Sequence, residues 1–441
     1  MRKLLLLSCV LALVLVGIGG ASAQDKYNGV DPTGVKLTYW HQYTRSPQSD
    51  TIDALVAQFN DTNQYGITVE AIAQGSYDDL RDLMNAAIIS GELPNLVAGY
   101  QNDALSYYHD DAALDLYPLV DDSTFGYSAD EMAKLNQGIL NIDVFPDEGG
   151  AMLAWPNQVS ASVQVVNMDM LAALGFDAPP EDYDTFKAIS CAAAQAEGTQ
   201  GYPMSLGSSE FENFLASMGA KIYENGQWNF SSDEAIATFQ LFADMYKEGC
   251  AYIPEGAYQN TNDFALSLNP MANTSTAGIP IISGNFETNL SDNNVPVPNW
   301  IVTTTPWTDD NRTIQLYVPS IIVVPATPEE EVASFLFLKF LSSAESQVAW
   351  TTGTGYFPVN LEAAASLSDY EAQNPRFAEA NAIISDPSVK IYSSPQVLSY
   401  SAIRDLVSKA WADVTSNGKD AATVAQQLTD DANAAQADMQ Q

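Results

Sequence analysis

Polar side chains that can hydrogen-bond a hydroxylated molecule follow three successive predicted strands. They are His41, Gln42 and Tyr43 after the first strand, Ser76 and Tyr77 after the second, and Gln101, Asn102 and Asp103 after the third. In open α/β sheets, ligands bind in the crevice outside the carboxyl ends of the strands. The alternative is that such residues only cap helices, as Ser76 and Asp103 could. Their recurrence at three strand ends favours a binding crevice.

These groups are positioned by an alternation of strands and helices near the start of the chain. The pattern predicts strands at 35–40, 67–73 and 95–100 and helices at 50–59 and 77–90. In the first helix, apolar residues recur at the i, i+3, i+4 and i+7 spacing of one buried face. Strand and helix alternation is typical of a parallel sheet covered by helices, so we predict an α/β fold.

Residues 151–190 mark the point where the chain passes from one group of elements to another. An extended piece ends at Trp155-Pro156, and an alternating strand follows in which Val159, Ala161, Val163 and Val165 share a face. A short helix at 168–174 then stops at a glycine, which can adopt the left-handed conformation of a helix cap. The pattern therefore predicts a boundary between two lobes near residue 156.

This stretch resembles the corresponding segment of the extracellular solute-binding proteins of ABC importers. The matching residues are Pro156, Asn167, Asp169, Leu171, Gly175, Asp177, Pro179, Pro180, Tyr183 and Phe186. Gly355, Tyr356, Phe357 and Pro358 are similar to a second motif of the family. The resemblance is closest to the carbohydrate and glycerol-3-phosphate binding group, which includes maltose-binding proteins, and it covers nearly the whole mature chain.

The resemblance implies a periplasmic-binding-protein type II fold, in which two α/β lobes are joined by a hinge of several crossings. The first lobe would comprise residues 24–156 and 318–358, and the second lobe residues 157–317 and 359–441. Ligand would bind in the cleft between them and favour the closed form. The protein would deliver its ligand to the permease subunits of the transporter and act as a monomer without a cofactor.

Rings and amides at the implied cleft suit a sugar, because the C–H face of a pyranose stacks on aromatic rings while its hydroxyls need polar partners. Each ring taken singly could instead belong to the core. The residues that we expect to contact ligand are Gln42, Tyr43, Tyr77, Gln101, Asn102, Asp103, Ser160, Tyr183, Asn285, Trp307, Tyr317 and Tyr356.

Glycerol 3-phosphate or another polyol phosphate is the alternative ligand. The family's phosphate-binding members usually carry an arginine where this chain has Gln396, and phosphate prefers a bidentate guanidinium. Arg404 follows one or two helical turns later and is a possible substitute. The missing arginine makes a sugar or oligosaccharide the first choice.

Two other classes of protein fit the sequence less well. A secreted glycoside hydrolase needs two carboxylates that flank the scissile bond, but with 55 acidic residues candidate pairs carry no information. Sequence motifs of serine hydrolases, zinc enzymes and nucleotide-binding loops are absent, so we do not expect an enzyme. A surface-layer protein would show repeats of fixed period, and the sequence contains none.

Composition restricts partners and compartment. The net charge of −38 makes nucleic acid and anionic membranes poor partners, because both require a basic surface. A basic start, an apolar run and small residues at Ala21 and Ala23 predict a signal peptide at residues 1–23, so we expect export to the periplasm or cell surface. Cys191 and Cys250 could pair there, or stay free. With only two histidines, a metal site is not expected.

Overall fold

The structure is a computed structural model that describes residues 26–256 and 258–439. The predicted signal peptide lies outside the described residues. Among the residues that are described, no helix combines the length and the apolar character needed to cross a bilayer.

One five-stranded sheet has the order β2-β1-β3-β15-β6. Its strands are β1 (Lys36–His41), β2 (Thr68–Ala73), β3 (Leu96–Gly99), β6 (Trp155–Pro156) and β15 (Ser320–Val323). β1 runs parallel to both β2 and β3, as the alternation predicts, whereas β15 runs antiparallel to β3 and to β6. A segment from late in the chain therefore completes the sheet that the N-terminal strands begin.

Five longer helices accompany this first sheet. They are α1 (Gln48–Thr62), α2 (Tyr77–Ser90), α3 (Gln101–His109), α13 (Pro328–Leu341) and α14 (Ala344–Thr354). The predicted apolar face of α1 is confirmed, since Ile52, Leu55, Val56 and Phe59 are all buried. Shorter elements in this part of the chain are α4 (Tyr117–Val120), α5 (Ala129–Met132), α6 (Gln137–Leu140), η2 (Asn141–Asp143), β4 (Val144–Phe145), η3 (Pro146–Glu148) and β5 (Ala151–Met152).

A second sheet has the order β12-β7-β14-β16, with β13 also paired to β7. Its strands are β7 (Ser160–Asn167), β12 (Met271–Ser275), β13 (Trp300–Thr303), β14 (Thr313–Tyr317) and β16 (Lys390–Tyr392). β7 is the central strand, because β12, β13 and β14 all pair with it in antiparallel fashion. Every residue of β7 is buried, so both of its faces are covered rather than one alone.

The remaining elements are helices and short strands. They are α7 (Met168–Ala173), α8 (Tyr183–Gln195), β8 (Tyr202–Pro203), α9 (Ser208–Met218), β9 (Tyr223–Glu224), β10 (Gln227–Trp228), α10 (Asp233–Lys247), β11 (Ala251–Tyr252), α11 (Gln259–Ala265), η4 (Thr276–Gly278), α12 (Ile279–Asn293), α15 (Leu361–Ala365), α16 (Ser368–Gln373), α17 (Pro375–Ser385), α18 (Tyr400–Val414) and α19 (Ala421–Asp438). An aromatic core that includes Phe211, Phe242 and Trp411 joins α9, α10 and α18. A disulfide between Cys191 and Cys250 links α8 to the start of β11.

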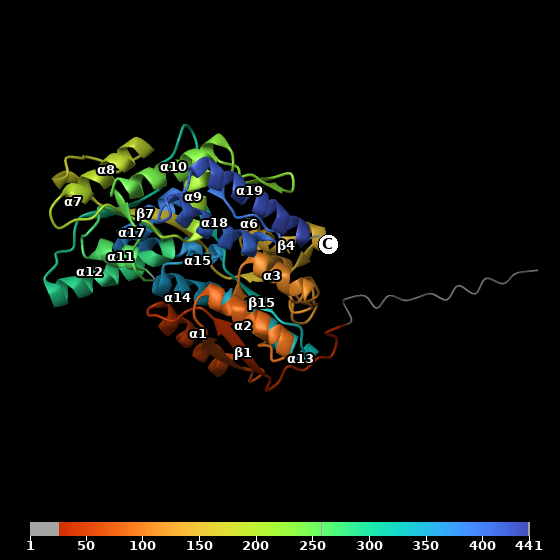
Figure 1. The fold of residues 1–441 in the computed structure, drawn as a ribbon. Coiled ribbons are helices and arrows are strands. Elements are labelled where there is room, and N and C mark those ends of the chain that lie inside the picture. Colours follow the sequence, from red (N-terminus) through yellow and green to blue (C-terminus); the bar gives the residue numbers. More distant parts are fainter. Residues whose placement is uncertain (1–25, 257, 440–441) are drawn as a thin grey trace, which may run out of the picture.

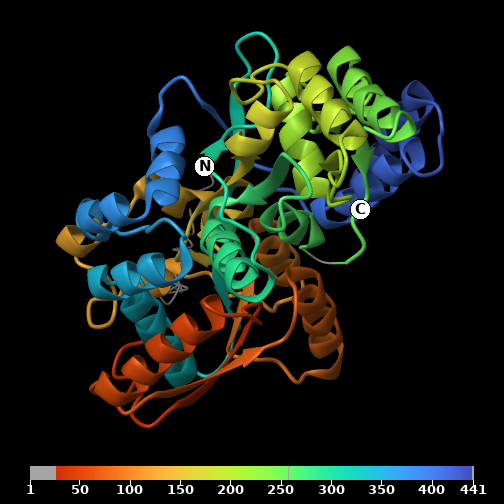
Figure 2. The same cartoon turned by 90° about the vertical axis from the view of Figure 1, so that its left-hand side faces the viewer.

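The strands fall into the two groups that the predicted lobes require. β6 and β7 are consecutive but lie in different sheets, and so do β14 and β15. Figure 1 shows α1, α2 and α13 in the lower part of the molecule and α8, α10 and α19 in its upper part, and in Figure 2 the red to orange N-terminal elements again lie at the bottom. The division of strands agrees with the predicted crossings, and the residue boundaries of the lobes stay a prediction.

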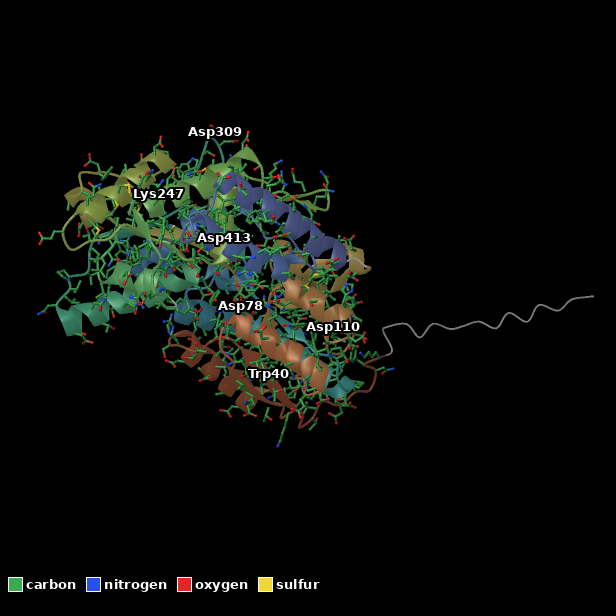
Figure 3. The ribbon with its side chains drawn as sticks, viewed as in Figure 1. Trp40, Asp78, Asp110, Lys247, Asp309 and Asp413 are labelled. Carbon is green, nitrogen blue, oxygen red and sulfur yellow. A yellow bond between two sulfur atoms is a disulfide. The ribbon has the colours of Figure 1, made fainter. Side chains whose placement is uncertain are left out.

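Some of the acidic side chains lie on separate elements of the fold. Figure 3 labels Asp78, Asp110, Asp309 and Asp413 as examples.

Candidate ligand-binding cavity

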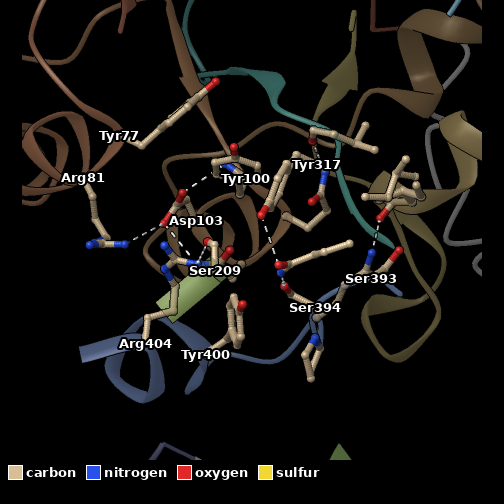
Figure 4. A pocket seen from close by; sticks show the side chains of 18 of the residues that line it. Tyr77, Arg81, Tyr100, Asp103, Ser209, Tyr317, Ser393, Ser394, Tyr400 and Arg404 are labelled. Carbon is tan, nitrogen blue, oxygen red and sulfur yellow. Dashed lines mark hydrogen bonds and ion pairs between the residues drawn. The ribbon is translucent and has the colours of Figure 1, made fainter. Parts of the chain in front are cut away.

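A cavity of about 230 Å³ lies between the two groups of elements. The first group lines it with Ser76, Tyr77, Asp78, Arg81, Tyr100, Gln101, Asn102, Asp103 and Ile142. The second group contributes Ser209, Gln315, Leu316, Tyr317, Ser393, Ser394, Pro395, Gln396, Tyr400 and Arg404, and Val318 lines the cavity from the crossing between β14 and β15 (Figure 4). The cavity thus has one wall from each predicted lobe.

The first-lobe wall is built from the starts of α2 and α3. Ser76 caps α2 in a reciprocal pair of hydrogen bonds with Asp79, which confirms the predicted cap. Gly75 precedes it with φ +106, and a Cβ there would come within 2.5 Å of the Asp79 carboxylate. This tight turn sets the direction in which Tyr77 leaves the sheet.

Asp103 is not the cap of its helix that the sequence allowed. It lies in the first turn of α3, where its carboxylate accepts a hydrogen bond of 3.0 Å from the backbone N–H of Tyr100. Arg81 lies 3.8 Å away and is also hydrogen-bonded to Asp78. Burial nevertheless raises the pKa of Asp103 above its ordinary value.

Gln101 is anchored from behind the wall. Its side-chain amide donates to Asp143 Oδ1 and to the Val318 carbonyl, each at 2.9 Å. Asp143 also accepts a 2.6 Å hydrogen bond from the Ser320 hydroxyl. Burial raises the pKa of Asp143 to about 7, even though both hydrogen bonds favour its charged form.

Tyrosine hydroxyls gather at the deep end of the first-lobe wall. The rings of Tyr77 and Tyr100 are 4.7 Å apart, and Gln42 donates a 2.7 Å hydrogen bond to the Tyr77 hydroxyl. Burial raises the pKa of Tyr77, Tyr43 and Tyr356 well above the ordinary value. These hydroxyls are therefore neutral at physiological pH and can both donate and accept hydrogen bonds.

The second-lobe wall is a chain of polar side chains. The Tyr317 hydroxyl donates to the side-chain oxygen Oε1 of Gln315 at 3.1 Å, and the side-chain nitrogen Nε2 of Gln315 donates to the Ser394 hydroxyl at 2.9 Å. Arg404 donates to the Ser209 hydroxyl at 2.9 Å (Figure 4). The ion pairs formed among the described residues do not include Arg404. Its guanidinium therefore keeps donors that a ligand could use.

Direct contacts already join the two walls. The Asn102 amide donates a 2.6 Å hydrogen bond to the Ser401 hydroxyl at the start of α18. The Gln396 amide donates to the Ile142 carbonyl at 2.7 Å. The guanidinium of Arg45 also lies over the ring of Tyr258, 4.1 Å from its centroid.

The predicted ligand residues divide into three groups. Five line the cavity: Tyr77, Gln101, Asn102, Asp103 and Tyr317. Four are buried or half-buried behind its walls: Gln42, Tyr43, Ser160 and Tyr356. Among these four, Tyr43 accepts a 2.6 Å hydrogen bond from Gln158, and the Tyr356 ring stacks on Trp350 with centroids 5.9 Å apart.

The remaining three predicted residues do not line the cavity. Tyr183 is buried in the second-lobe core, where its ring packs near Phe186 and its hydroxyl meets Ser217. The resemblance to the family would place Asn285 at a strand end facing the cleft, together with Ser283 and Gly284. Residues 279–293 instead form helix α12, and the Asn285 amide donates to Asn262. Trp307 is half-buried against the guanidinium of Arg312.

Several lining residues were not predicted, above all Tyr100, Ser209, Ser394 and Tyr400. Tyr100 directly precedes the predicted Gln101, so the third strand end could have included it. Tyr400 and Arg404 are four residues apart on α18 and share a helix face, which is the sequence signal that a search for second-lobe residues could have used.

Several solved binding proteins have a similar fold. The GacH receptor of Streptomyces glaucescens, solved unliganded and with acarbose, has a TM-score of 0.78 at 15% identity over 92% of this chain and 99% of that chain. UgpB of Mycobacterium tuberculosis with glycerophosphocholine also gives 0.78, at 16% identity over 92% and 99%. Maltose-bound MalE3 of T. maritima gives 0.75, at 18% identity over 90% and 99%.

These likenesses confirm the periplasmic-binding-protein type II fold. The comparison with curated proteins finds no match. The family model described as bacterial extracellular solute-binding protein matches residues 54–379, which is well over half of the sequence. The chain therefore belongs to the family of bacterial extracellular solute-binding proteins, as the sequence resemblance predicted.

Proposed function

We propose that this protein is the substrate-binding component of an ABC importer, and that it captures a small sugar by closure of its two lobes. The observation that carries the proposal is a cavity whose walls come from both lobes and present tyrosine rings, amides and hydroxyls beside the charged side chains of Asp78, Arg81, Asp103 and Arg404. A ligand that contacts both walls binds the closed form better than the open form, and so shifts the population towards closure. The closed form would then be recognised by the permease subunits.

The cavity favours one small sugar over a long oligosaccharide. Its volume of about 230 Å³ is below the roughly 300–1,000 Å³ typical of sites for drug-sized ligands. Tyr77, Tyr100, Tyr317 and Tyr400 offer ring faces and hydroxyls, while Gln101 offers an amide. Rings and neutral hydrogen-bonding groups together are the surface that a sugar ring requires.

A polyol phosphate is the second candidate, and Arg404 is the observation that favours it. The guanidinium lines the cavity, hydrogen-bonds Ser209 and belongs to none of the ion pairs among the described residues. Arginine binds phosphate through paired donors in a fixed geometry. UgpB, which has a similar fold, was solved with a phosphodiester ligand, glycerophosphocholine.

Thermal-shift screening followed by calorimetry separates the two candidates. The panel contains monosaccharides, maltose, maltotriose, glycerol 3-phosphate and glycerophosphocholine, and the proteins are wild type, Arg404→Gln and the control Arg312→Gln. Arg312 pairs with Asp386 away from the cavity. We expect a small sugar to raise the melting temperature of wild type and of the control. Stabilisation by a phosphate ester alone, lost in Arg404→Gln but not in Arg312→Gln, would support the second candidate.

The family match is with binding proteins and so speaks against the glycoside hydrolase alternative. We infer that the protein is not an enzyme, acts as a monomer and works in the periplasm or at the cell surface. Incubation with mixed oligosaccharides should give no hydrolysis products. Light scattering should give the mass of one chain.

A further inference from the structure

Helix α9 carries two buried glutamates with different surroundings. Glu210 accepts hydrogen bonds from the Tyr202 hydroxyl at 2.8 Å and from the backbone N–H of Ser205 at 3.3 Å. Glu212, only 1% exposed, accepts from the Tyr400 hydroxyl at 2.9 and 2.8 Å. It also accepts from the hydroxyls of Tyr392 and Ser394, each at 3.3 Å. One buried carboxylate thus gathers three hydroxyl donors.

All three donors belong to residues 390–404, which form much of the second-lobe wall. Ser393, Ser394, Pro395, Gln396, Tyr400 and Arg404 line the cavity. The backbone of this segment has little support from the sheet, since β16 is three residues long and pairs only with β14. Figure 4 shows Ser394, Tyr400 and Arg404 converging on the cavity from this stretch.

The chemistry of Glu212 makes it an effective anchor for this segment. Hydrogen bonds to a carboxylate are about twice as strong as those between neutral groups, and a buried carboxylate left without partners is costly. The pKa of Glu212 is raised by burial, while Arg404 and the three hydroxyls oppose that rise. The carboxylate and the segment therefore stabilise each other's position.

We propose that Glu212 is a positioning residue for the ligand site. It holds the hydroxyls of Tyr392, Ser394 and Tyr400 and thereby fixes the second-lobe wall, with Tyr400 and Arg404 facing the cavity. The inference rests on the proposed function in so far as the cavity is the ligand site. Glu210, two residues earlier on the same helix, performs no such task, because its partners lie in the core.

The first test needs no ligand. Hydrogen–deuterium exchange is measured on the full-length mature protein as wild type, Glu212→Gln and the matched control Glu210→Gln. We expect exchange in peptides covering 390–404 to be about tenfold faster in Glu212→Gln, because losing charge-assisted hydrogen bonds makes local opening easier. In Glu210→Gln, exchange should rise around 202–205 and stay unchanged in 390–404. Equal exchange in the two variants over 390–404 would overturn the proposal.

The second test asks whether Glu212 acts through Tyr400. Affinities for maltose and for glycerol 3-phosphate are measured for wild type, Glu212→Gln, Tyr400→Phe and the double variant. If Glu212 positions Tyr400, the losses of binding free energy in the two single variants are not additive, and the double variant binds each probe about as well as Glu212→Gln alone. Additive losses refute this route. If wild type binds neither probe, these proposed ligands fail while the exchange test still decides the role of Glu212.

Should Glu212→Gln not fold, Tyr392→Phe takes its place. Tyr392 contacts Glu212 but does not line the cavity, so its hydroxyl serves only the anchor. The variant should speed exchange in 390–404 without change around 202–205. Unchanged exchange in both segments would contradict the proposal.

Discussion

The buried carboxylate Asp143 allows a quantitative prediction about stability and pH. Asp143 is fully buried beneath the first-lobe wall and accepts hydrogen bonds from Gln101 and Ser320. Burial raises its pKa from 3.8 to about 7. The folded protein therefore retains this proton at pH values where the unfolded chain has lost it. Consequently the free energy of unfolding must fall as the pH rises between these two values.

Each pH unit between the unfolded and folded pKa lowers the free energy of unfolding by about 1.4 kcal/mol. The titration of Asp143 therefore lowers it by about 4 kcal/mol between pH 4 and pH 7. Asparagine has nearly the same shape and does not titrate. We therefore expect Asp143→Asn to lack this part of the decline, and the difference in unfolding free energy between wild type and variant to change by about 4 kcal/mol over that range.

Urea unfolding at half-unit steps from pH 4 to 8.5 measures the difference. Other titrating groups contribute almost equally to both proteins and cancel in the comparison. Glu210 offers an independent check, because burial raises its pKa to about 8, so the corresponding difference for Glu210→Gln should continue to grow up to pH 8. Parallel stability curves for wild type and Asp143→Asn would refute the reasoning.

Three further changes test other parts of the structure. Tyr356→Ala should lower the free energy of unfolding by about 3–5 kcal/mol in urea titrations, because the ring is 8% exposed and truncation leaves a cavity beside Trp350; a change below 1 kcal/mol would contradict this packing. Replacing both disulfide cysteines by serine should cost about 4 kcal/mol, since the bridge closes a loop with a separation of 59 residues, and added thiol should then affect only wild type. Arg45→Ala removes the contact with Tyr258 between the lobes, so small-angle scattering should show a larger radius of gyration; an identical radius would show that this contact does not hold the lobes together.

Local periodicity was sufficient for the N-terminal part of the fold. The alternation at 35–100 predicted three strands and two helices, and the structure confirms β1, α1, β2, α2 and β3 with ends that differ by at most three residues. The polar residues after β2 and β3 line the cavity as expected, because the first turn of a helix that follows a parallel strand must lie at that edge of the sheet, whereas His41, Gln42 and Tyr43 at the end of β1 do not line it. In this part of the chain, the position of a residue relative to the end of a strand therefore predicts where it lies in the fold.

Prediction failed where local signals conflicted. The run at 279–282 is apolar and β-branched, and Gly284 follows it, which together are typical of a strand and turn. The structure forms helix α12 instead, with Pro280 in its first turn, where a missing N–H costs nothing. Asn285 is therefore inside a helix. Tyr183 was expected at the cleft but lies in the core for a different reason. An aromatic ring suits a core as well as a cleft, and only tertiary packing decides between them.

The two walls of the cavity differ in how far sequence can predict them. The first-lobe wall is local, because Tyr77 and Gln101 each begin a helix directly after a strand. The second-lobe wall is assembled from α9, β14 and residues 393–404, which are far apart in the chain and have no common periodic signal. A glutamate inside a helix is ordinarily expected at the surface, so nothing local marks Glu212 as buried. The hydrogen bond from Asn102 to Ser401 joins the first-lobe wall, which the sequence predicts, to the second-lobe wall, which it does not. Closure of the proposed cleft therefore depends on contacts that only the folded chain defines.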